Sequence, residues 1–167
     1  YFRFITRSAE DEVPLEREVE HARIYADIQR IRFSSRISVD FEELPEEYRN
    51  ITVPRLILQP IIENAFEHGL ENKVSGGLLH IGFEQQDGHL SIIVEDNGDS
   101  LEDVELECLQ RILVDRDGRA ESTGIINIHR RLRLKFGDQS GLSVSRSPLG
   151  GFRVEICIGT SGGERNV

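Results

Sequence analysis

Two β-hairpins constrain the fold of this chain more than any other feature of its sequence. A strand with one buried face carries apolar residues at every second position. This spacing occurs on both sides of the turn sequence QDGH and again on both sides of SPLGG. The sequence therefore predicts one hairpin over residues 78–95 and a second over 142–158. The residues expected to face the core are Leu79, Ile81, Phe83, Leu90, Ile92, Val94, Leu142, Val144, Phe152, Val154, Ile156 and Ile158.

A long helix is expected ahead of the first hairpin. Pro14 stands where a first helical residue is favoured, and acidic residues crowd the turn that follows it, so we predict a helix over residues 14–33. Its apolar residues form two stripes, which is typical of a helix that packs against more than one neighbour. One stripe comprises Leu15, Val19, Ala22 and Ala26, and the other comprises Ile24, Ile28 and Ile31.

The remaining elements complete an α+β pattern. Alternation predicts a strand over 36–43, and an apolar run predicts a helix from Pro54 to His68 with a kink at Pro60. Two more helices are expected over 101–113 and 123–136. The order strand, helix, hairpin, two helices, hairpin predicts a two-layer α/β sandwich. We expect a mixed or antiparallel sheet of about five strands with three helices on one face, preceded by the N-terminal helical segment.

Composition excludes several classes of function. The net charge of −10 argues against a general nucleic-acid or anionic-membrane surface, which needs clustered Lys and Arg. No apolar run approaches the roughly 20 residues that cross a bilayer. Cys108 and Cys157 have no metal-ligand spacing. The sequence contains no Met, so we interpret it as a fragment of a larger protein.

Three segments place polar residues and glycines where a core pattern would not require them. In QPIIENAFEHG, Glu63 and Asn64 interrupt a helix that is otherwise built for burial. In VEDNGDS, a strand ends at Asp96, and Gly98 leaves room beside it. In STGIINIHRRL, Gly124 leads into a helix.

Each segment suits one part of a nucleotide. A carboxylate at a strand end can accept a hydrogen bond from an exocyclic amine such as that of adenine. A helix N-terminus offers free N–H groups to phosphate, and an Asn amide oxygen can bind Mg²⁺. Each segment alone also has a purely structural interpretation, as a turn, as relief of backbone strain or as a local hydrogen bond.

Together, the three segments and the later SPLGGFRVEI resemble a known family. They are similar to the N, G1 and G2 boxes and the final strand of the catalytic domain of LytS/YesM-like sensor histidine kinases. These kinases share an ATPase superfamily with DNA gyrase and mismatch-repair ATPases. The resemblance covers roughly residues 13–159 and implies the Bergerat fold, ATP and Mg²⁺ as cofactors, and a mobile lid over residues 100–123.

The resemblance assigns roles to individual residues. Asn64 takes the position of the Mg²⁺ ligand. Asn64 and Glu63 together take the positions of the catalytic residues, with Glu63 in a supporting role. Asp96 takes the position of the carboxylate that contacts the adenine amine, and Gly98 lies beside it. Gly124 takes the position of the phosphate-side glycine. The other residues expected to bind the nucleotide are His68, Ser100, Ser122, Thr123 and Ile125.

Four positions depart from the pattern of this family, and a fifth differs from gyrase-like hydrolases. Ser100 and Ser122 replace glycines, Glu67 replaces a common Lys, and Phe152 replaces a common Thr. Pro60 occupies the position where gyrase-like hydrolases carry a general-base Glu, which favours phosphotransfer over hydrolysis. The departures leave two alternatives open. One is a degenerate nucleotide-sensing or interaction module with weak or no ATP binding, and the other is a Ser/Thr-directed kinase of the anti-sigma type.

The resemblance also predicts organisation and partners. Residues 1–35 are expected to end a dimerisation or linker region, residues 36–159 to form the ATP-binding domain, and residues 160–167 to form a disordered tail. The implied partners are an acceptor-His dimerisation helix upstream of this fragment and a cognate response regulator. The implied parent is a homodimer anchored in the bacterial cell membrane, with this domain in the cytoplasm and in contact with neither nucleic acid nor membrane.

Overall fold

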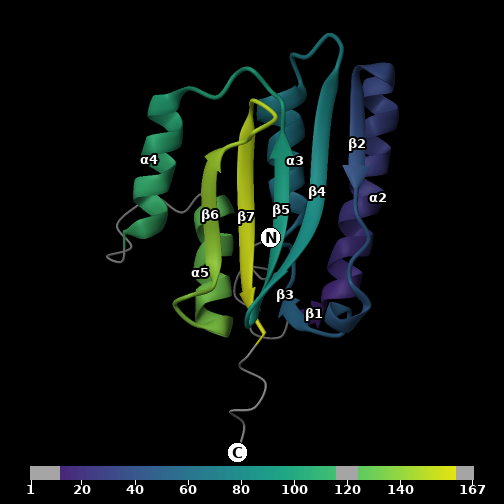
Figure 1. The fold of residues 1–167 in the computed structure, drawn as a ribbon. Helices are drawn as coiled ribbons and strands as arrows, with labels where there is room; N and C mark the ends of the chain where they lie inside the picture. The colour runs from purple at the N-terminus through teal and green to yellow at the C-terminus, as the bar shows by residue number, and fades with distance from the viewer. Residues whose placement is uncertain (1–11, 116–123, 161–167) are drawn as a thin grey trace, which may run out of the picture.

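A five-stranded mixed sheet organises the protein (Figure 1). The computed structural model describes residues 12–115 and 124–160. The strands are β1 (Glu12–Pro14), β2 (Ile37–Phe41), β3 (Thr52–Pro54), β4 (Gly77–Gln86), β5 (His89–Asp96), β6 (Gly141–Arg146) and β7 (Phe152–Gly159). The α-helices are α2 (Leu15–Phe33), α3 (Gln59–Asn64), α4 (Asp103–Val114) and α5 (Gly124–Phe136), and α3 continues as the π-helical turn η3 (Ala65–Leu70). Short 3-10 turns η1 (Ser34–Arg36) and η2 (Glu46–Tyr48) precede β2 and β3.

The strand order in the main sheet is β2-β4-β5-β7-β6. Both predicted hairpins are confirmed: β4 pairs antiparallel with β5, and β6 pairs antiparallel with β7. The central pair β5 and β7 is also antiparallel, whereas β2 runs parallel to β4 with Ile37 opposite Gly77. The connection from β2 to β4 contains α3, as a parallel crossover requires.

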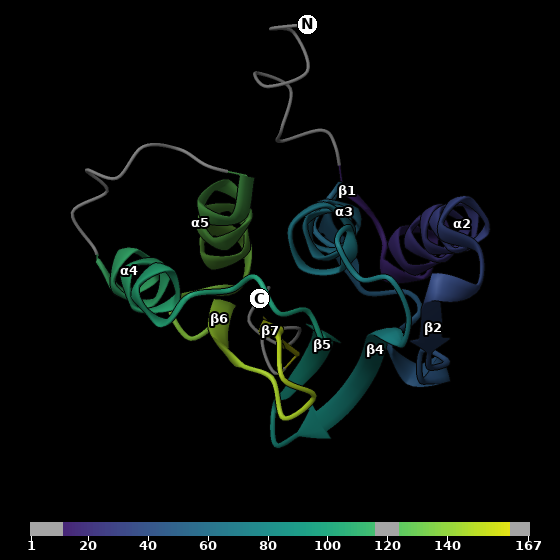
Figure 2. The same cartoon turned by 90° about the horizontal axis from the view of Figure 1, so that it is seen from above.

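The four α-helices of the described residues lie on one side of the sheet, as the view from above shows (Figure 2). The core lies between these two layers. Every residue predicted to face it from the two hairpins does so, with Ile81, Leu90, Ile92, Ile156 and Ile158 fully buried. The period-two alternation therefore identified the inner face of the sheet correctly.

Helix α2 confirms the predicted helix and its inner stripe, although it begins at Leu15 and Pro14 ends strand β1. Leu15, Val19, Ala22 and Ala26 are buried against the rest of the core. The second stripe is different, because Ile24, Ile28 and Ile31 remain exposed. Within the described residues this face has no covering neighbour, contrary to the expectation that both stripes would be packed.

The predicted helix from Pro54 was wrong at its start. Residues 52–54 form strand β3, and the helix begins only at Gln59, so Pro60 lies in its first turn and does not kink it. The reason is the backbone conformation of Leu56, whose φ of 56° lies in the left-handed region that a right-handed helix cannot contain. The loop is held in this shape by Glu18, which accepts hydrogen bonds from the N–H groups of Leu56 (2.8 Å) and Ile57 (3.3 Å).

A second, two-stranded sheet was not predicted. Strand β1 pairs antiparallel with β3 just before α2 begins. Leu15 and Ala22 of α2 are buried in the same core as the sheet residues. The expected boundary between residues 35 and 36 stays a prediction.

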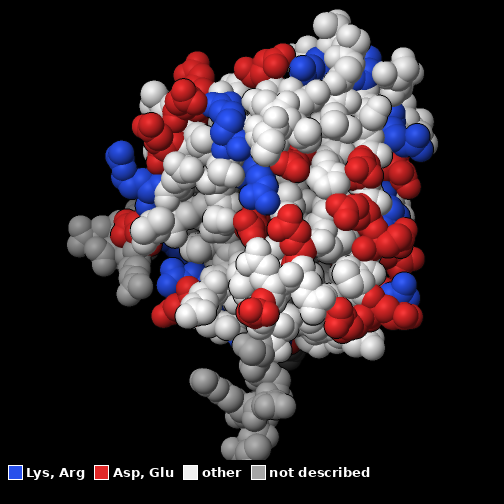
Figure 3. Space-filling view, in the orientation of Figure 1, with Lys and Arg blue, Asp and Glu red and all other residues white. Residues whose placement is uncertain are grey.

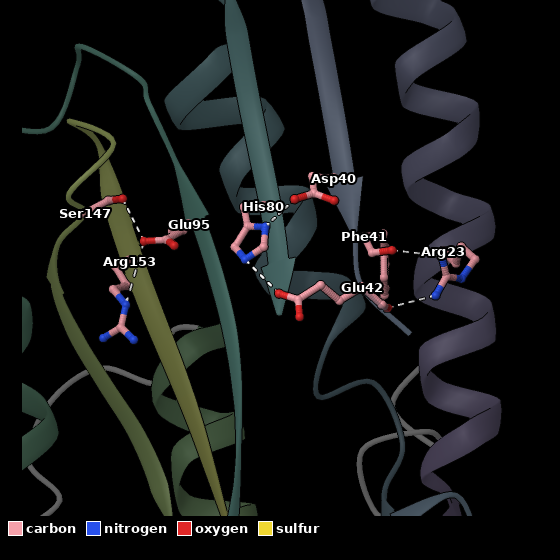
Figure 4. A network of polar contacts seen from close by, with 8 residues as sticks. All are labelled: Arg23, Asp40, Phe41, Glu42, His80, Glu95, Ser147 and Arg153. Atoms are coloured by element: carbon pink, nitrogen blue, oxygen red, sulfur yellow. Dashed lines mark hydrogen bonds and ion pairs between the residues drawn. The ribbon is translucent and has the colours of Figure 1, made fainter. Parts of the chain in front are cut away.

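The other face of the sheet is polar. Viewed from that side, charged side chains are spread over the strands (Figure 3). Glu95 of β5, Arg153 of β7 and Asp40 of β2 are among them (Figure 4). Among the described residues, no helix combines the length and the apolar character needed to span a membrane.

Candidate functional site

A cavity lies at one end of the sheet, between η3, the end of β5 and the start of α4. Its volume is about 210 Å³. Its lining residues are Asn64, His68, Gly69, Asp96, Gly98, Ser100, Leu101, Glu105 and Phe152. Two of the three polar segments singled out in the sequence thus meet in one cavity.

The most buried polar group of the cavity is the Asp96 carboxylate. The residue is 2% exposed although it is an acid. Its Oδ1 accepts hydrogen bonds from the backbone N–H groups of Gly98 (2.8 Å) and Phe152 (3.4 Å). Burial raises the pKa of Asp96 above its ordinary value, and the bonds from Gly98 and Phe152 act against this rise. Because both of these donors bond to Oδ1, no hydrogen bond within 12–115 and 124–160 occupies Oδ2, which can accept one from a ligand.

Three glycines let the chain pack closely around this carboxylate. A Cβ atom at position 69 would lie 2.8 Å from Asp96 Oδ2, and one at position 151 would lie 2.1 Å from Asp96 Oδ1. A Cβ atom at position 98 would lie 2.1 Å from the backbone oxygen of Gly69. Gly98 is therefore required already by the approach of two chain segments, independently of any ligand.

Two polar residues beside Asp96 stabilise the loops of the cavity. Asn97 accepts a hydrogen bond from the Leu78 N–H and donates one to the Gly76 carbonyl oxygen, each at 2.8 Å. The Ser100 hydroxyl donates a hydrogen bond to the carbonyl oxygen of His68. Ser100, which replaces a family glycine, thus ties the segment after β5 to η3.

Glu63 and Asn64 of α3 differ in their hydrogen bonds and in their position relative to the cavity. Glu63 accepts a hydrogen bond from the Gln59 side chain at 3.1 Å and does not line the cavity. Asn64 lines the cavity, and none of the hydrogen bonds recorded among the described residues involves its side-chain amide. Asn64 is thus the residue of this pair with free hydrogen-bonding capacity toward a ligand.

The start of α4 forms one wall of the cavity through Leu101 and Glu105. Glu105 accepts a hydrogen bond from the Glu102 backbone N–H at 3.3 Å, one half of a capping box. The carboxylate is therefore partly engaged in fixing the helix end.

The third polar segment is only partly described. Gly124 is the first residue of α5, it is exposed, and neither it nor Ile125 lines the cavity. Ser122 and Thr123 lie outside the described residues, as do residues 116–123 of the expected lid. No group of three or more His, Cys, Asp or Glu side chains within 12–115 and 124–160 is arranged to hold a metal ion.

Sequence reasoning missed several residues of the site. Gly69 and Gly151 belong to motifs that the sequence analysis quoted. The sequence did not indicate that both lie against the buried Asp96 carboxylate. Leu101 and Glu105 line the cavity only because α4 begins beside it. Phe152 was noted as a departure, and its N–H turns out to bond to Asp96.

Comparisons with solved structures define the class of the fold. The ATP-binding domain of PrrB from Mycobacterium tuberculosis is similar with a TM-score of 0.57 and 19% identity, over 89% of this chain and 96% of that one. The catalytic domain of histidine kinase ThkA is similar with a TM-score of 0.61 and 13% identity, over 89% of this chain and 95% of that one. The fold is that of histidine-kinase catalytic domains.

Sequence relatives define the family. The chain is 31% identical to Sensor histidine kinase BtsS of Escherichia coli over 93% of its own length, and 32% identical to Sensor histidine kinase YesM of Bacillus subtilis over 89%. It is 31% identical to Sensor protein LytS of Oceanobacillus iheyensis over 86%. The chain therefore belongs to the LytS/YesM/BtsS family of sensor histidine kinases, as the catalytic ATP-binding domain.

Two further findings concern how far this match extends. The chain spans about a quarter of the length of the curated relatives it matches, with 24% of LytS and 25% of BtsS covered. A scan against protein-family models gave no match.

Proposed function

We propose that this domain binds Mg·ATP in the cavity at Asp96 and transfers the γ-phosphate to a histidine on a helix that lies outside this chain. The observation that carries the proposal is the buried Asp96 carboxylate, which lines the cavity and has one oxygen held by backbone N–H groups. The family relationship supports the same reaction.

The adenine end of the proposed site rests on Asp96. Its Oδ2 would accept a hydrogen bond from the exocyclic amine of adenine, and the charge of the acid strengthens such a bond. Gly69, Gly98 and Gly151 let the backbone pack closely around the carboxylate, which would fix its position for contact with the base. Leu101 and Phe152 supply apolar and aromatic surface against which a base can pack.

The metal end of the proposed site rests on Asn64. An amide oxygen is a suitable ligand for Mg²⁺, which accepts few protein ligands and retains several waters and phosphate oxygens. Asn64 lines the same cavity as Asp96 and is not engaged by another described side chain. Mg²⁺ would neutralise charge on the phosphates during transfer. The phosphate-side role of Gly124, and the roles of Ser122, Thr123 and Ile125, remain part of the proposal.

The chemistry of the helix favours transfer over hydrolysis. Pro60 stands one turn before Asn64 and has no group that can accept a proton from water. Glu63, which bonds to Gln59, is proposed to support the position of Asn64 and not to activate water. Phosphoryl transfer needs positioning and charge neutralisation more than covalent chemistry from the protein.

The partners of the parent protein are proposed from relatives. A solved complex of histidine kinase ThkA with response regulator TrrA covers 92% of this chain with a TM-score of 0.61. We propose that a cognate response regulator likewise receives the phosphate from the parent of this chain. An upstream acceptor-His helix, a dimeric parent and its anchoring in the bacterial cell membrane belong to the same proposal.

Isothermal titration calorimetry of the chain with a non-hydrolysable ATP analogue tests the proposal, with and without Mg²⁺. We expect saturable binding with one nucleotide per chain and tighter binding with Mg²⁺. Absence of binding at millimolar analogue would refute the proposed function.

One observation favours a competing function. Phe152 brings a bulky ring to the cavity. The family resemblance implies Thr at this position, whose hydroxyl could bond to nucleotide or water. A domain that keeps the fold without binding ATP would then act as an interaction or nucleotide-sensing module. The substitution Phe152→Thr separates the two functions. A module that has lost ATP through this ring gains binding on substitution, whereas a competent kinase domain binds before it.

A further inference from the structure

A buried acid of α2 contacts the loop that leads into α3. Glu18 is 4% exposed, and a charged side chain is rarely so buried unless it is paired. Its Oε1 accepts a hydrogen bond from the Leu56 N–H at 2.8 Å, and its Oε2 accepts one from the Ile57 N–H at 3.3 Å. The carboxylate therefore lies across the backbone just before α3 begins at Gln59. We call residues 55–57 the Leu56 turn.

A guanidinium of α5 holds the carbonyl groups of the same turn. Arg131 donates hydrogen bonds to the carbonyl oxygens of Arg55 at 2.6 Å and Leu56 at 3.0 Å. Burial lowers the pKa of Arg131, and the negative charge of Glu18 acts against this fall, so the two charges attract each other. The N–H and the carbonyl oxygen of Leu56 are thus bonded to opposite charges, from the two helices on either side of α3 (Figure 2).

Leu56 needs this restraint because its backbone conformation is unfavourable for a leucine. Its φ of 56° lies in the left-handed region, which is sterically costly for a residue with a Cβ atom. Burial of the side chain does not offset this cost, since Leu56 is 49% exposed. The next two side chains, Ile57 and Leu58, are fully buried. The left-handed residue thus directs its neighbours into the core, and the charges of Glu18 and Arg131 hold it in that conformation.

The Leu56 turn sets where α3 starts, and α3 carries Asn64. Leu58 is the N-cap residue of this helix, two positions after Leu56. Its carbonyl oxygen accepts the hydrogen bonds from Ile61 (3.1 Å) and Ile62 (3.2 Å) that open the helix. Successive residues of an α-helix are rotated by about 100° around its axis. A helix that started one residue earlier or later would therefore turn the Asn64 side chain away from the cavity that it lines.

We propose that Glu18 is a positioning residue for phosphotransfer, which holds Asn64 at the cavity by keeping Leu56 in its left-handed conformation. This role rests on the proposed function, because it acts through the proposed metal ligand Asn64. Glu18 does not line the cavity itself and touches neither nucleotide nor metal. It belongs to the segment 1–35 that was predicted to end a linker region, so the ATP-binding unit includes part of α2.

Two substitutions separate this role from a general effect on folding. Glu18→Gln keeps the shape of the side chain but replaces one accepting oxygen by a donating NH₂ group, so one N–H of the Leu56 turn loses its partner. Leu56→Gly removes the need for that partner, because glycine adopts the left-handed region without steric cost. The double variant Glu18→Gln/Leu56→Gly should therefore recover the position of Asn64, which Glu18→Gln alone should lose.

NMR spectroscopy of this chain without nucleotide reports on the surroundings of Asn64. Its side-chain amide signals are assigned through their loss in Asn64→Ala. We expect Glu18→Gln to shift these signals and Glu18→Gln/Leu56→Gly to return them to their wild-type positions. The matched control is Glu16→Gln, the same change at an exposed acid of α2 that pairs with Arg49 at 3.7 Å. The control should leave the Asn64 signals in place.

Phosphotransfer by the parent kinase tests the kinetic consequence. We expect kcat to fall at least about tenfold in Glu18→Gln while the KM for ATP changes less than about twofold, because a misplaced metal ligand slows transfer more than it weakens binding. The double variant should transfer phosphate as the wild type does. Circular dichroism shows which variants are folded. If Glu18→Gln unfolds, Arg131→Lys takes its place, since lysine lacks the planar fork that bonds to two carbonyl oxygens. The same shift and the same recovery with Leu56→Gly are then expected.

The outcomes distinguish this role from the proposed function. Unshifted Asn64 signals in folded Glu18→Gln, or a double variant as slow as Glu18→Gln, overturn the positioning role. A fall in kcat that matches the unfolded fraction of the variant also overturns it, because that result describes stability alone. A wild type that binds no ATP refutes the proposed function, whereas the NMR signals still decide whether Glu18 positions Asn64.

Discussion

Replacing Asp96 by Asn separates ligand recognition from folding. The substituted amide keeps a carbonyl oxygen that can accept the hydrogen bonds from Gly98 and Phe152, and it has nearly the same volume. It places an NH₂ group where Oδ2 now lies, so two donors would meet if the ligand is adenine. The site therefore loses one charge-assisted hydrogen bond, worth about 1.5–3 kcal/mol, or roughly 10- to 150-fold in the dissociation constant.

The same substitution has the opposite effect on stability. Burial raises the pKa of Asp96 in the folded state, so the unfolded chain gives up this proton at a lower pH than the folded protein does. The folded wild type consequently loses stability as pH rises from the ordinary Asp value through the folded-state pKa. The substituted side chain does not ionise. We expect Asp96→Asn to be at least as stable as the wild type at neutral pH, with this advantage shrinking as pH falls.

Calorimetry with an ATP analogue and urea unfolding at two pH values measure both effects. Glu95→Gln is the matched control, because it also removes a carboxylate from β5 but from the polar face, where Glu95 bonds to Ser147 at 2.8 Å (Figure 4). The control should bind nucleotide as the wild type does. Equal nucleotide affinity in Asp96→Asn and wild type would refute the adenine assignment. A large loss of stability at neutral pH would refute the account of its burial.

Three further predictions concern substitutions of single residues. Asn64→Ala should abolish Mg²⁺-dependent phosphotransfer by the parent kinase with a modest change in nucleotide affinity, and unchanged transfer would contradict the metal role. Gly98→Ala should lower the free energy of unfolding by about 1–3 kcal/mol, because the added Cβ would lie 2.1 Å from the backbone oxygen of Gly69. Urea unfolding measures this loss. Gly124→Ala is the control, since no atom lies within 4 Å of its new Cβ. Burial lowers the pKa of His129 in the folded state. As pH falls, the unfolded chain therefore protonates this imidazole before the folded protein does, and the domain should lose stability below the ordinary His value of 6.5. The pH dependence of unfolding should be shallower in His129→Gln, and an unchanged slope would exclude this residue as its source.

The sequence predicted most of the fold because the sheet has one buried face. Alternation identified the inner residues of β4, β5, β6 and β7, and the turns between them had strong local signals. The start of α3 was not predictable in this way. Its delay to Gln59 depends on the left-handed Leu56 and on the hydrogen bonds that this loop donates to Glu18, a residue 38 positions earlier in the chain. Local patterns carry no information about such distant bonds.

The candidate site was predicted in part for the same reason. Asp96, Gly98, His68, Asn64 and Ser100 line the cavity that the motifs implied. The contacts among these segments could not be inferred from a single motif, because they join parts of the chain that are distant in sequence. Ser100 illustrates this point, since the departure from glycine is compatible with a hydrogen bond to the His68 carbonyl oxygen.

The glycines around Asp96 have a consequence for how ligand binding should be measured. Gly69 follows α3, Gly98 follows β5, and Gly151 precedes β7, so the surroundings of one carboxylate are assembled from three distant stretches of the chain. No folding intermediate that lacks the central strands can contain this arrangement. A ligand bound at Asp96 therefore stabilises the whole domain and not one loop, and a thermal shift on ligand addition reports on cooperative unfolding of the complete sheet.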